Sequence, residues 1–387
     1  MPNEGAGGTG GGPAIVEGGL PVETPAHPND LTTDWLTDTL RARGVLVQAR
    51  VMSLTIQDLG TEKGITGHLA RVRLDYDTSE PDAPRSLIAK CSAGDPQARA
   101  MIHSRGFYER EVRFYEQLAA RSPLRTPHCY CSAIDLASGA SLLLLEDLAP
   151  AHNGSQIEGC SLEEAERAIR AVAAFHAAWW EHPHLGALNW LALRGFIAVD
   201  QARAAFKATW EPCLGKLGSA GPSNLREIGA WLDQHVDRLG ARLYAEAPAT
   251  IIHNDYQADN LFFGSAGNGQ SVAVVDWQLV TRGRGVWDVA YFLGGNLETD
   301  DRRKHELSLL HTYHRLLLEN GVQGYTFDQC LDEYRLGMLY SVFRLSRPLG
   351  IGAIPSEQER GFCEVLIPRY CRAVHDLNVG DVLQAVL

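Results

Sequence analysis

Four polar residues in the middle of the chain follow a spacing that suits phosphoryl transfer. His253, Asp255 and Asn260 fit the pattern H-x-D-x-x-x-x-N, and a strand-like run that starts at Val272 ends in Asp276. This order predicts a site that moves a phosphoryl group. Asp255 is the candidate catalytic residue, because a carboxylate can orient an acceptor hydroxyl and accept its proton. Asn260 and Asp276 are the candidate metal ligands, because Mg²⁺ prefers hard oxygen donors.

A cation for the phosphates is expected upstream of these residues. Residues 85–90 read as a strand that ends in Lys90, and a long helix is expected over about 97–121. Glu111 lies inside the apolar stripe of that helix. An inward carboxylate needs a partner, so we predict a Lys90–Glu111 ion pair and count both as catalytic residues. The alternatives are a lysine on the surface and a glutamate at the edge of the stripe.

The link between two expected strands, 51–56 and 68–76, is rich in glycine. Most such hairpins are only turns, but this one precedes the strand that carries Lys90. Its backbone can approach a phosphate closely, so it is a candidate cover for the nucleotide. The candidate nucleotide-binding glycines are Gly60, Gly64 and Gly67.

A hinge between two lobes is expected where strand 141–145 ends. Glu146 and Leu148 follow this strand, and exposed backbone N–H and C=O groups there could pair with adenine. Together with Lys90 and the glycines, these two residues complete the predicted nucleotide-binding set. A solvated acidic turn at Glu146 and Asp147 is the alternative.

Composition excludes some classes of partner. The chain has 35 Lys and Arg against 47 Asp and Glu, and this net charge of −12 argues against a nucleic-acid binder. No apolar run approaches the ~20 residues that span a bilayer, so no membrane insertion is expected. The eight scattered cysteines form no C-x-x-C pair and predict free thiols. These features favour a cytoplasmic protein and leave its oligomeric state open.

The order of expected elements predicts an α+β fold in two lobes. Residues 1–28, rich in Gly and Pro, are expected to be a disordered tail. Residues 29–147 form a mostly β, nucleotide-binding lobe in this interpretation, and 148–387 form a mostly helical lobe with the catalytic loop. Within the second lobe, the aromatic segment 195–250 is expected to bind the acceptor.

Several polar residues near the predicted site are assigned supporting positions. His253 is expected to be buried and to hydrogen-bond the loop backbone, and Asp288 is expected to tie the catalytic loop down. His176, on the apolar side of a helix over about 161–181, is interpreted as a core histidine. Residues 281–285 are expected to be a short flexible loop, with Arg282 and Arg284 in solvent, and contact of these arginines with an anionic substrate is the alternative.

These motifs resemble those of the aminoglycoside phosphotransferase/choline kinase superfamily, and within it the ecdysteroid-kinase-like group and its bacterial relatives. The matching stretches, in the family's order, are Gly60–Gly67, Lys90, Glu109–Tyr115, Leu144–Leu148, Phe175–Trp180, His253–Asn260, Val275–Gln278 and Asp288–Phe292. The resemblance implies a bilobal protein-kinase-like fold with a small antiparallel sheet and one long helix in the first lobe. It also implies ATP-dependent phosphorylation of a hydroxyl on a small molecule, with Asp255 as catalytic aspartate.

The chain shows two departures, one from its relatives and one from protein kinases. Asn254 stands where relatives often have glycine, although asparagine also accepts unusual backbone angles. Trp277 and Gln278 follow the metal aspartate, where protein kinases have Phe-Gly. The second departure is common in this superfamily and argues against a protein substrate.

The identity of the acceptor stays open between classes. Aminoglycosides are polycations, but segment 195–250 has balanced charges and many aromatic residues. This favours a bulky, largely apolar alcohol, such as a sterol-like compound or a hydroxyacyl thioester. The alternatives are an antibiotic phosphotransferase of the aminoglycoside or macrolide type, a nucleotide-binding pseudokinase that acts as an interaction module, and a metal-dependent hydrolase. The pseudokinase is disfavoured by the joint presence of the predicted catalytic and metal residues, and the hydrolase by the lack of a second histidine at ligand spacing.

Overall fold

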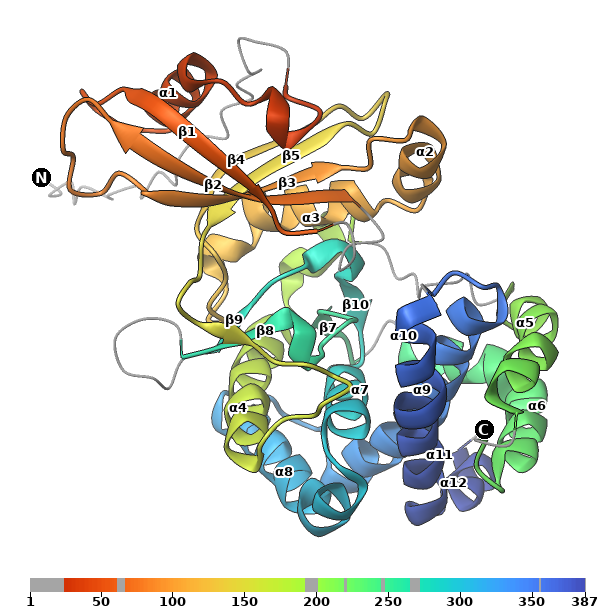
Figure 1. The fold of residues 1–387 in the computed structure, drawn as a ribbon. Helices are drawn as coiled ribbons and strands as arrows, with labels where there is room; N and C mark the ends of the chain where they lie inside the picture. Colours follow the sequence, from red (N-terminus) through yellow and green to blue (C-terminus); the bar gives the residue numbers. More distant parts are fainter. Residues whose placement is uncertain are drawn as a thin grey trace, which may run out of the picture.

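The structure is a computed structural model that describes residues 24–60, 67–191, 201–218, 221–244, 248–264, 272–354 and 356–386. Most of the expected tail lies outside these ranges, as do Gly64 and parts of segment 195–250. The described residues form an N-terminal lobe built on a sheet and a C-terminal lobe built mainly of helices (Figure 1).

An antiparallel five-stranded sheet in the order β1-β2-β3-β5-β4 forms the core of the first lobe. The strands are β1 (Val51–Asp58), β2 (Gly67–Tyr76), β3 (Ser86–Ser92), β4 (Cys129–Ile134) and β5 (Ser141–Glu146). Side chains alternate between the two faces of a strand. In β3, Leu87 and Ala89 face helix α1 (Thr33–Ala42), whose Leu36 and Leu40 pack in the same cluster. Lys90 therefore lies on the opposite face, toward the second lobe.

The helix expected over 97–121 is divided in two, so the prediction of one long helix is wrong. Helix α2 (Pro96–Ser104) ends before Gly106, and α3 (Phe107–Gln117) begins directly after it. Gly106 has a φ of +73°, a left-handed conformation that glycine adopts readily and that ends helices. The break lets α3 take its own direction beneath the sheet, where Glu111 and Phe114 are buried.

The second lobe contains helices α4 to α12 and several short strands. The helices are α4 (Leu162–Trp179), α5 (Ala202–Leu217), α6 (Leu225–Leu243), α7 (Val286–Asn296), α8 (Thr299–Glu319), α9 (Phe327–Gly350), α10 (Ser356–Gly361), α11 (Ile367–Asp376) and α12 (Val379–Val386). The strands are β6 (His152–Asn153), β7 (Thr250–Ile252), β8 (Leu261–Phe263), β9 (Val272–Val274) and β10 (Thr281–Gly283). Helix α7 is buried along its whole length, and α9 packs against α5, α6, α7 and α11.

Residues 281–283 form strand β10, so the expectation of a flexible loop is wrong there. This strand pairs with β7, and Thr281 lies opposite Ile252. The expectation that Arg284 lies in solvent is also wrong, because its buried guanidinium forms an ion pair with Glu333. Arg282 is half-buried, and its Nε donates to the backbone oxygen of Leu191 at 3.0 Å. The strand pairing fixes the segment that follows the candidate metal aspartate.

The remaining general expectations concern cysteines and the membrane. All eight cysteines are free, as predicted, and six of them are buried. Among the described helices, none combines the length and apolar character that a bilayer crossing requires.

Candidate functional site

Backbone pairing brings the separated parts of the sequence motif together. Strand β7 leads into the loop from His253 to Asn260, and β9 leads into Val275 and Asp276. The Nε2 atom of His253 lies 2.9 Å from the backbone oxygen of Val275, and the N–H of Val275 donates to the oxygen of Asn260 at 3.0 Å. Asn260 and Asp276, the two candidate metal ligands, are therefore held beside the loop that carries Asp255.

Asp288 at the start of α7 fixes the beginning of that loop. Its fully buried carboxylate accepts from the backbone N–H groups of His253 at 2.7 Å and Asn254 at 2.8 Å. It also lies 3.3 Å from Nε2 of His176, whose Nδ1 is 3.0 Å from the hydroxyl of Tyr313. Asp288 and His176 thus hold the positions expected for a loop anchor and a core histidine.

Lys90 pairs with one carboxylate of its own lobe and with one of the second lobe. Its Nζ lies 2.8 Å from Oε1 of Glu111 and 3.0 Å from Oδ1 of Asp276. Burial alone would lower the pKa of Lys90, but the two carboxylates outweigh burial and raise it, so the lysine is a cation. Burial raises the pKa of Glu111, and the charge of Lys90 opposes that rise. The expected Lys90–Glu111 pair is present in the structure.

Asp276 and Asn260 present oxygen atoms suitable for a hard cation. Asp276 has a φ of +64°, and its side chain is 40% exposed. Burial raises its pKa, but Lys90 outweighs burial and holds the pKa below its usual range, so the carboxylate is ionised. The amide nitrogen of Asn260 donates to the backbone oxygen of Asp255 at 3.0 Å, which turns its Oδ1 to the other side. These donors fit Mg²⁺.

Asp255 forms an ion pair with an arginine from a distant helix. Its Oδ1 lies 2.7 Å from Nη2 of Arg344 in α9, and its Oδ2 accepts from Nδ2 of Asn260 at 3.2 Å. Burial raises the pKa of Asp255, and the charge of Arg344 opposes the rise. Arg344 has no place in the sequence motif. A sequence signal for Arg344 was nevertheless present, because Arg344 is a charged residue in an apolar helical stripe, four residues after the buried Tyr340.

The described glycines stand at the two ends of the β1–β2 link. Gly60 has a φ of +94°, and a Cβ on Gly67 would lie 2.1 Å from the backbone oxygen of Cys91. Glycine is therefore required at Gly67 by close packing against β3. No such account applies to Gly64, which lies outside the described residues.

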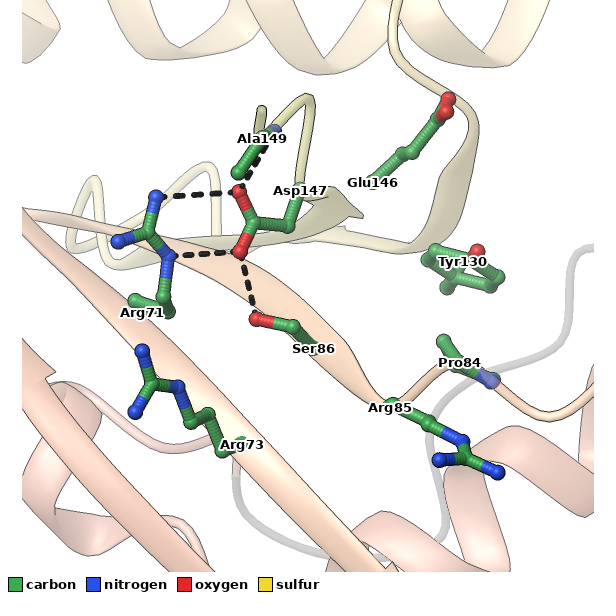
Figure 2. Close-up of a pocket in the computed structure, with 9 residues that line it drawn as sticks. All are labelled: Arg71, Arg73, Pro84, Arg85, Ser86, Tyr130, Glu146, Asp147 and Ala149. Carbon is green, nitrogen blue, oxygen red and sulfur yellow. Dashed lines mark hydrogen bonds and ion pairs between the residues drawn. The ribbon is translucent and has the colours of Figure 1, made fainter. Parts of the chain in front are cut away.

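A cavity of about 380 Å³ lies at the hinge end of β3 (Figure 2). Ser86 lines this cavity on the same face of β3 as Lys90, four residues or about 13 Å away along the strand. Asp147 is held at its edge, where it accepts from Arg71 Nε and from Ser86 Oγ, both at 2.6 Å. The other lining residues are Arg73, Pro84, Arg85, Tyr130, Glu146 and Ala149.

The two predicted hinge residues have different surroundings. The carboxylate of Glu146 accepts from Arg125 Nη2 at 2.7 Å and from the N–H of His128 at 2.9 Å. Leu148 is buried. The sequence reasoning missed Asp147 and Arg71, which join the hinge to the sheet 76 residues upstream.

The aromatic side chains of segment 195–250 pack between helices. Phe206 and Trp210 in α5 are buried, and a Cβ on Gly229 of α6 would lie 2.6 Å from Trp210 Nε1. The ring of Phe206 also contacts Phe343 of α9. These residues therefore position the helices, and their aromatic character is not by itself a sign of the acceptor.

The chain resembles known proteins in its sequence family and in its fold. A model of the ecdysteroid kinase-like family matches residues 63–321. A comparison with curated protein sequences found no match. The structure is similar to aminoglycoside 2′-phosphotransferase-IIIa in its GDP complex, with a TM-score of 0.55 and 11% identity over 89% of this chain and 100% of that one. It is also similar to a choline/ethanolamine kinase family protein from Mesorhizobium loti, with a TM-score of 0.50 and 15% identity over 91% and 99%. These structural similarities confirm the bilobal kinase-like fold.

Proposed function

Since the chain belongs to the ecdysteroid kinase-like family and is a small-molecule phosphotransferase of that kind, we propose that it transfers the γ-phosphate of ATP to a hydroxyl group of a bulky, largely apolar acceptor. The observation that supports this most strongly is the position of Lys90. It forms ion pairs with Glu111 of the first lobe and with Asp276 of the second, and the residue before Asp276 is hydrogen-bonded to the loop that carries Asp255. Phosphoryl transfer needs a cation, metal ligands and a hydroxyl-orienting carboxylate close together.

The nucleotide is proposed to lie along the inner face of β3. Its phosphates would meet Lys90, and its base would lie near the cavity beside Ser86 and the backbone at Glu146 and Leu148. The β1–β2 link, with Gly60, Gly64 and Gly67, would cover the phosphates. At a strand rise of about 3.3 Å per residue, Lys90 and the cavity beside Ser86 are separated by a length that a nucleoside triphosphate can span.

Mg²⁺ is proposed to bind Asn260 and Asp276. Within the described ranges no group of three or more His, Cys, Asp and Glu side chains forms a metal site of its own. This agrees with a cation that takes its remaining ligands from phosphate oxygens and water. When bound, Mg²⁺ would neutralise phosphate charge. Asp276 is ionised and partly exposed, as such a ligand must be.

Asp255 is proposed to orient the acceptor hydroxyl and to accept its proton. Three side chains contact its carboxylate, Arg344 at Oδ1 and both Asn260 and Gln257 at Oδ2. A fixed carboxylate lowers the entropic cost of bringing the hydroxyl into line. An interaction module does not require a carboxylate held in one orientation, so this arrangement favours an enzyme over a pseudokinase.

The charges near Asp255 argue against a polycationic acceptor. Arg344 is a cation directly at the catalytic carboxylate. In α6, Asp237 is paired with Arg203, and Asp233 lies 3.7 Å from Lys207. The described part of segment 195–250 therefore offers no surplus of acid for an aminoglycoside. This observation favours a largely apolar alcohol, such as a sterol-like compound or a hydroxyacyl thioester, over the antibiotic alternatives.

The test is a screen for ATP consumption over a library of hydroxyl compounds, with mass detection of an added phosphate. We expect turnover with one or more sterol-like or hydroxyacyl compounds. Phosphorylation of aminoglycosides alone would overturn the acceptor proposal. Failure to bind Mg-ATP or to phosphorylate any compound would overturn the kinase and favour the interaction module.

A further inference from the structure

Arg344 is a nearly buried cation whose position depends on the catalytic loop. Its side chain is 10% exposed, and its guanidinium lies 2.7 Å from Oδ1 of Asp255. Its Nη1 also donates to the backbone oxygen of Asn254. A buried charge is costly unless it is paired, so the arginine and the loop hold each other in place.

An aromatic ring fixes the plane of this guanidinium. The Cζ atom of Arg344 lies 4.5 Å from the ring centre of Tyr291 in α7. Tyr291 in turn stacks on Tyr370 of α11, whose hydroxyl donates to the backbone oxygen of Tyr291. Arginine stacks well on aromatic faces, and its planar fork then loses little freedom when it bonds a carboxylate.

Asn254 connects Arg344 to helix α7 and to Tyr244, the residue that follows α6. Its Oδ1 accepts from Trp287 Nε1 at 2.8 Å, from the hydroxyl of Tyr244 at 3.1 Å and from Arg344 Nη1 at 3.4 Å. Its Nδ2 donates to the backbone oxygen of Leu279 at 3.2 Å. Asn254 has a φ of +65°, which glycine would also adopt, but glycine could make none of these side-chain bonds.

We propose that Arg344 is a positioning residue for phosphoryl transfer, which holds the Asp255 carboxylate in one orientation with the support of Asn254. This inference rests on the proposed kinase function. Asn260 at 3.2 Å and Gln257 at 3.4 Å donate to Oδ2 while Arg344 holds Oδ1, so the contacts at both oxygens restrict rotation of the carboxylate. The remaining lone pairs of Asp255 are then aimed at one place, where the acceptor hydroxyl must lie.

The experiment compares Arg344→Met and Arg344→Lys with wild type and with Arg335→Met. Arg335 is the matched control, because it lies on the same helix and is also paired with an aspartate, Asp332, at 3.4 Å. The readouts are kcat and KM for ATP, with the best acceptor of the screen or with water as the acceptor. Mg-ADP affinity and thermal unfolding are measured in parallel.

We expect Arg344→Met to lower kcat by about 10²-fold, the cost of a small misplacement of a reacting group, with Mg-ADP affinity within about twofold of wild type. Arg344→Lys should recover part of kcat, and Asn254→Gly should lower kcat less than Arg344→Met does. In an Arg344→Ala variant, added guanidinium ion should restore part of kcat and leave KM for ATP unchanged. Arg335→Met should match wild type.

Three outcomes would overturn the inference. One is an unchanged kcat in Arg344→Met. Another is a loss of Mg-ADP affinity in parallel with kcat, which would indicate a general structural role. The third is an absence of rescue by both lysine and guanidinium ion. A wild-type protein that neither binds nor turns over ATP would instead overturn the proposed function itself.

Discussion

The two ends of the candidate site are built in different ways. At the proposed phosphate end, Lys90 pairs with Glu111 of its own lobe and with Asp276 of the other lobe, and the aspartate side chain is 40% exposed. At the acceptor end, Asp255 and Arg344 pair within one lobe, with side-chain exposures of 21% and 10%. The Lys90–Asp276 pair can therefore respond to lobe movement and to a nucleotide, whereas the Asp255–Arg344 pair is held by the packed helices. We therefore expect substitutions at the proposed phosphate end to change nucleotide binding and substitutions at the proposed acceptor end to change kcat.

The largest expected effect falls at the acceptor end. Asp255→Asn keeps the size of the side chain but removes the proton acceptor, so kcat should fall by about 10³-fold, within the range for general-base catalysis. Mg-ATP affinity should persist, because Asp255 is not a proposed phosphate contact. The measurement is steady-state turnover together with calorimetric titration of Mg-ADP. Turnover close to wild type would show that another group orients the hydroxyl.

Removal of the proposed metal ligand should affect binding first. Asp276→Ala should weaken Mg-ATP binding by about tenfold or more, because it removes a charged oxygen ligand and one partner of Lys90. The readout is the concentration of Mg²⁺ that gives half-maximal activity, which should rise. Asp259→Ala serves as the control, because Asp259 is an exposed aspartate of the neighbouring His253–Asn260 loop whose carboxylate accepts from the backbone N–H of Gln156. An unaltered Mg²⁺ dependence in Asp276→Ala would contradict the metal assignment.

A smaller effect is expected when only one partner of Lys90 is neutralised. Glu111→Gln keeps a polar group of equal size, and Lys90 remains paired with Asp276. We expect KM for ATP to rise by about three- to tenfold, with kcat changed less than in Arg344→Met. Steady-state kinetics with varied ATP make the comparison. A loss of kcat without a change in KM would show that this end also acts through geometry.

The smallest expected effect on activity concerns the hinge. Asp147 accepts from Arg71 and Ser86. Burial raises the pKa of Asp147, but these hydrogen bonds outweigh burial and lower it overall. Asp147→Asn should therefore lower the free energy of unfolding by about 2 kcal/mol at neutral pH, with little change in kcat.

The pH dependence of this effect follows from the direction of the shift. Since the folded pKa is depressed, the stabilisation is complete above the unfolded value of about 3.9 and is lost as pH falls through the folded pKa. The stability difference between wild type and Asp147→Asn should narrow below that pH in denaturant titrations. A difference that stays constant would show that the ion pair with Arg71 is not its source.

Contacts between neighbouring elements could be predicted from sequence, whereas contacts between residues far apart in the chain could not. The Lys90–Glu111 pair could be predicted because a charge inside a helical stripe must find a partner, and the strand before the helix offered one. The same reasoning applied to Arg344 would have required its partner to be known, and Asp255 lies 89 residues earlier. The break at Gly106 was missed because a single glycine inside a helical pattern is often tolerated, while the turn direction depends on how α3 packs beneath the sheet.

Sequence alone determined the family motif and the two-lobe order, and it supplied Asp255, Asn260 and Asp276 as candidate site residues, because these depend on short spacings within a loop and its flanking strands. The tertiary structure decided what surrounds them. Packing of α9 against α7 placed Arg344 at Asp255, Phe206 and Trp210 of the expected acceptor segment are buried between helices, and pairing of β10 with β7 ordered the residues before the buried Arg284. Such contacts join residues far apart in the chain, and a local pattern contains no information about which distant element lies opposite.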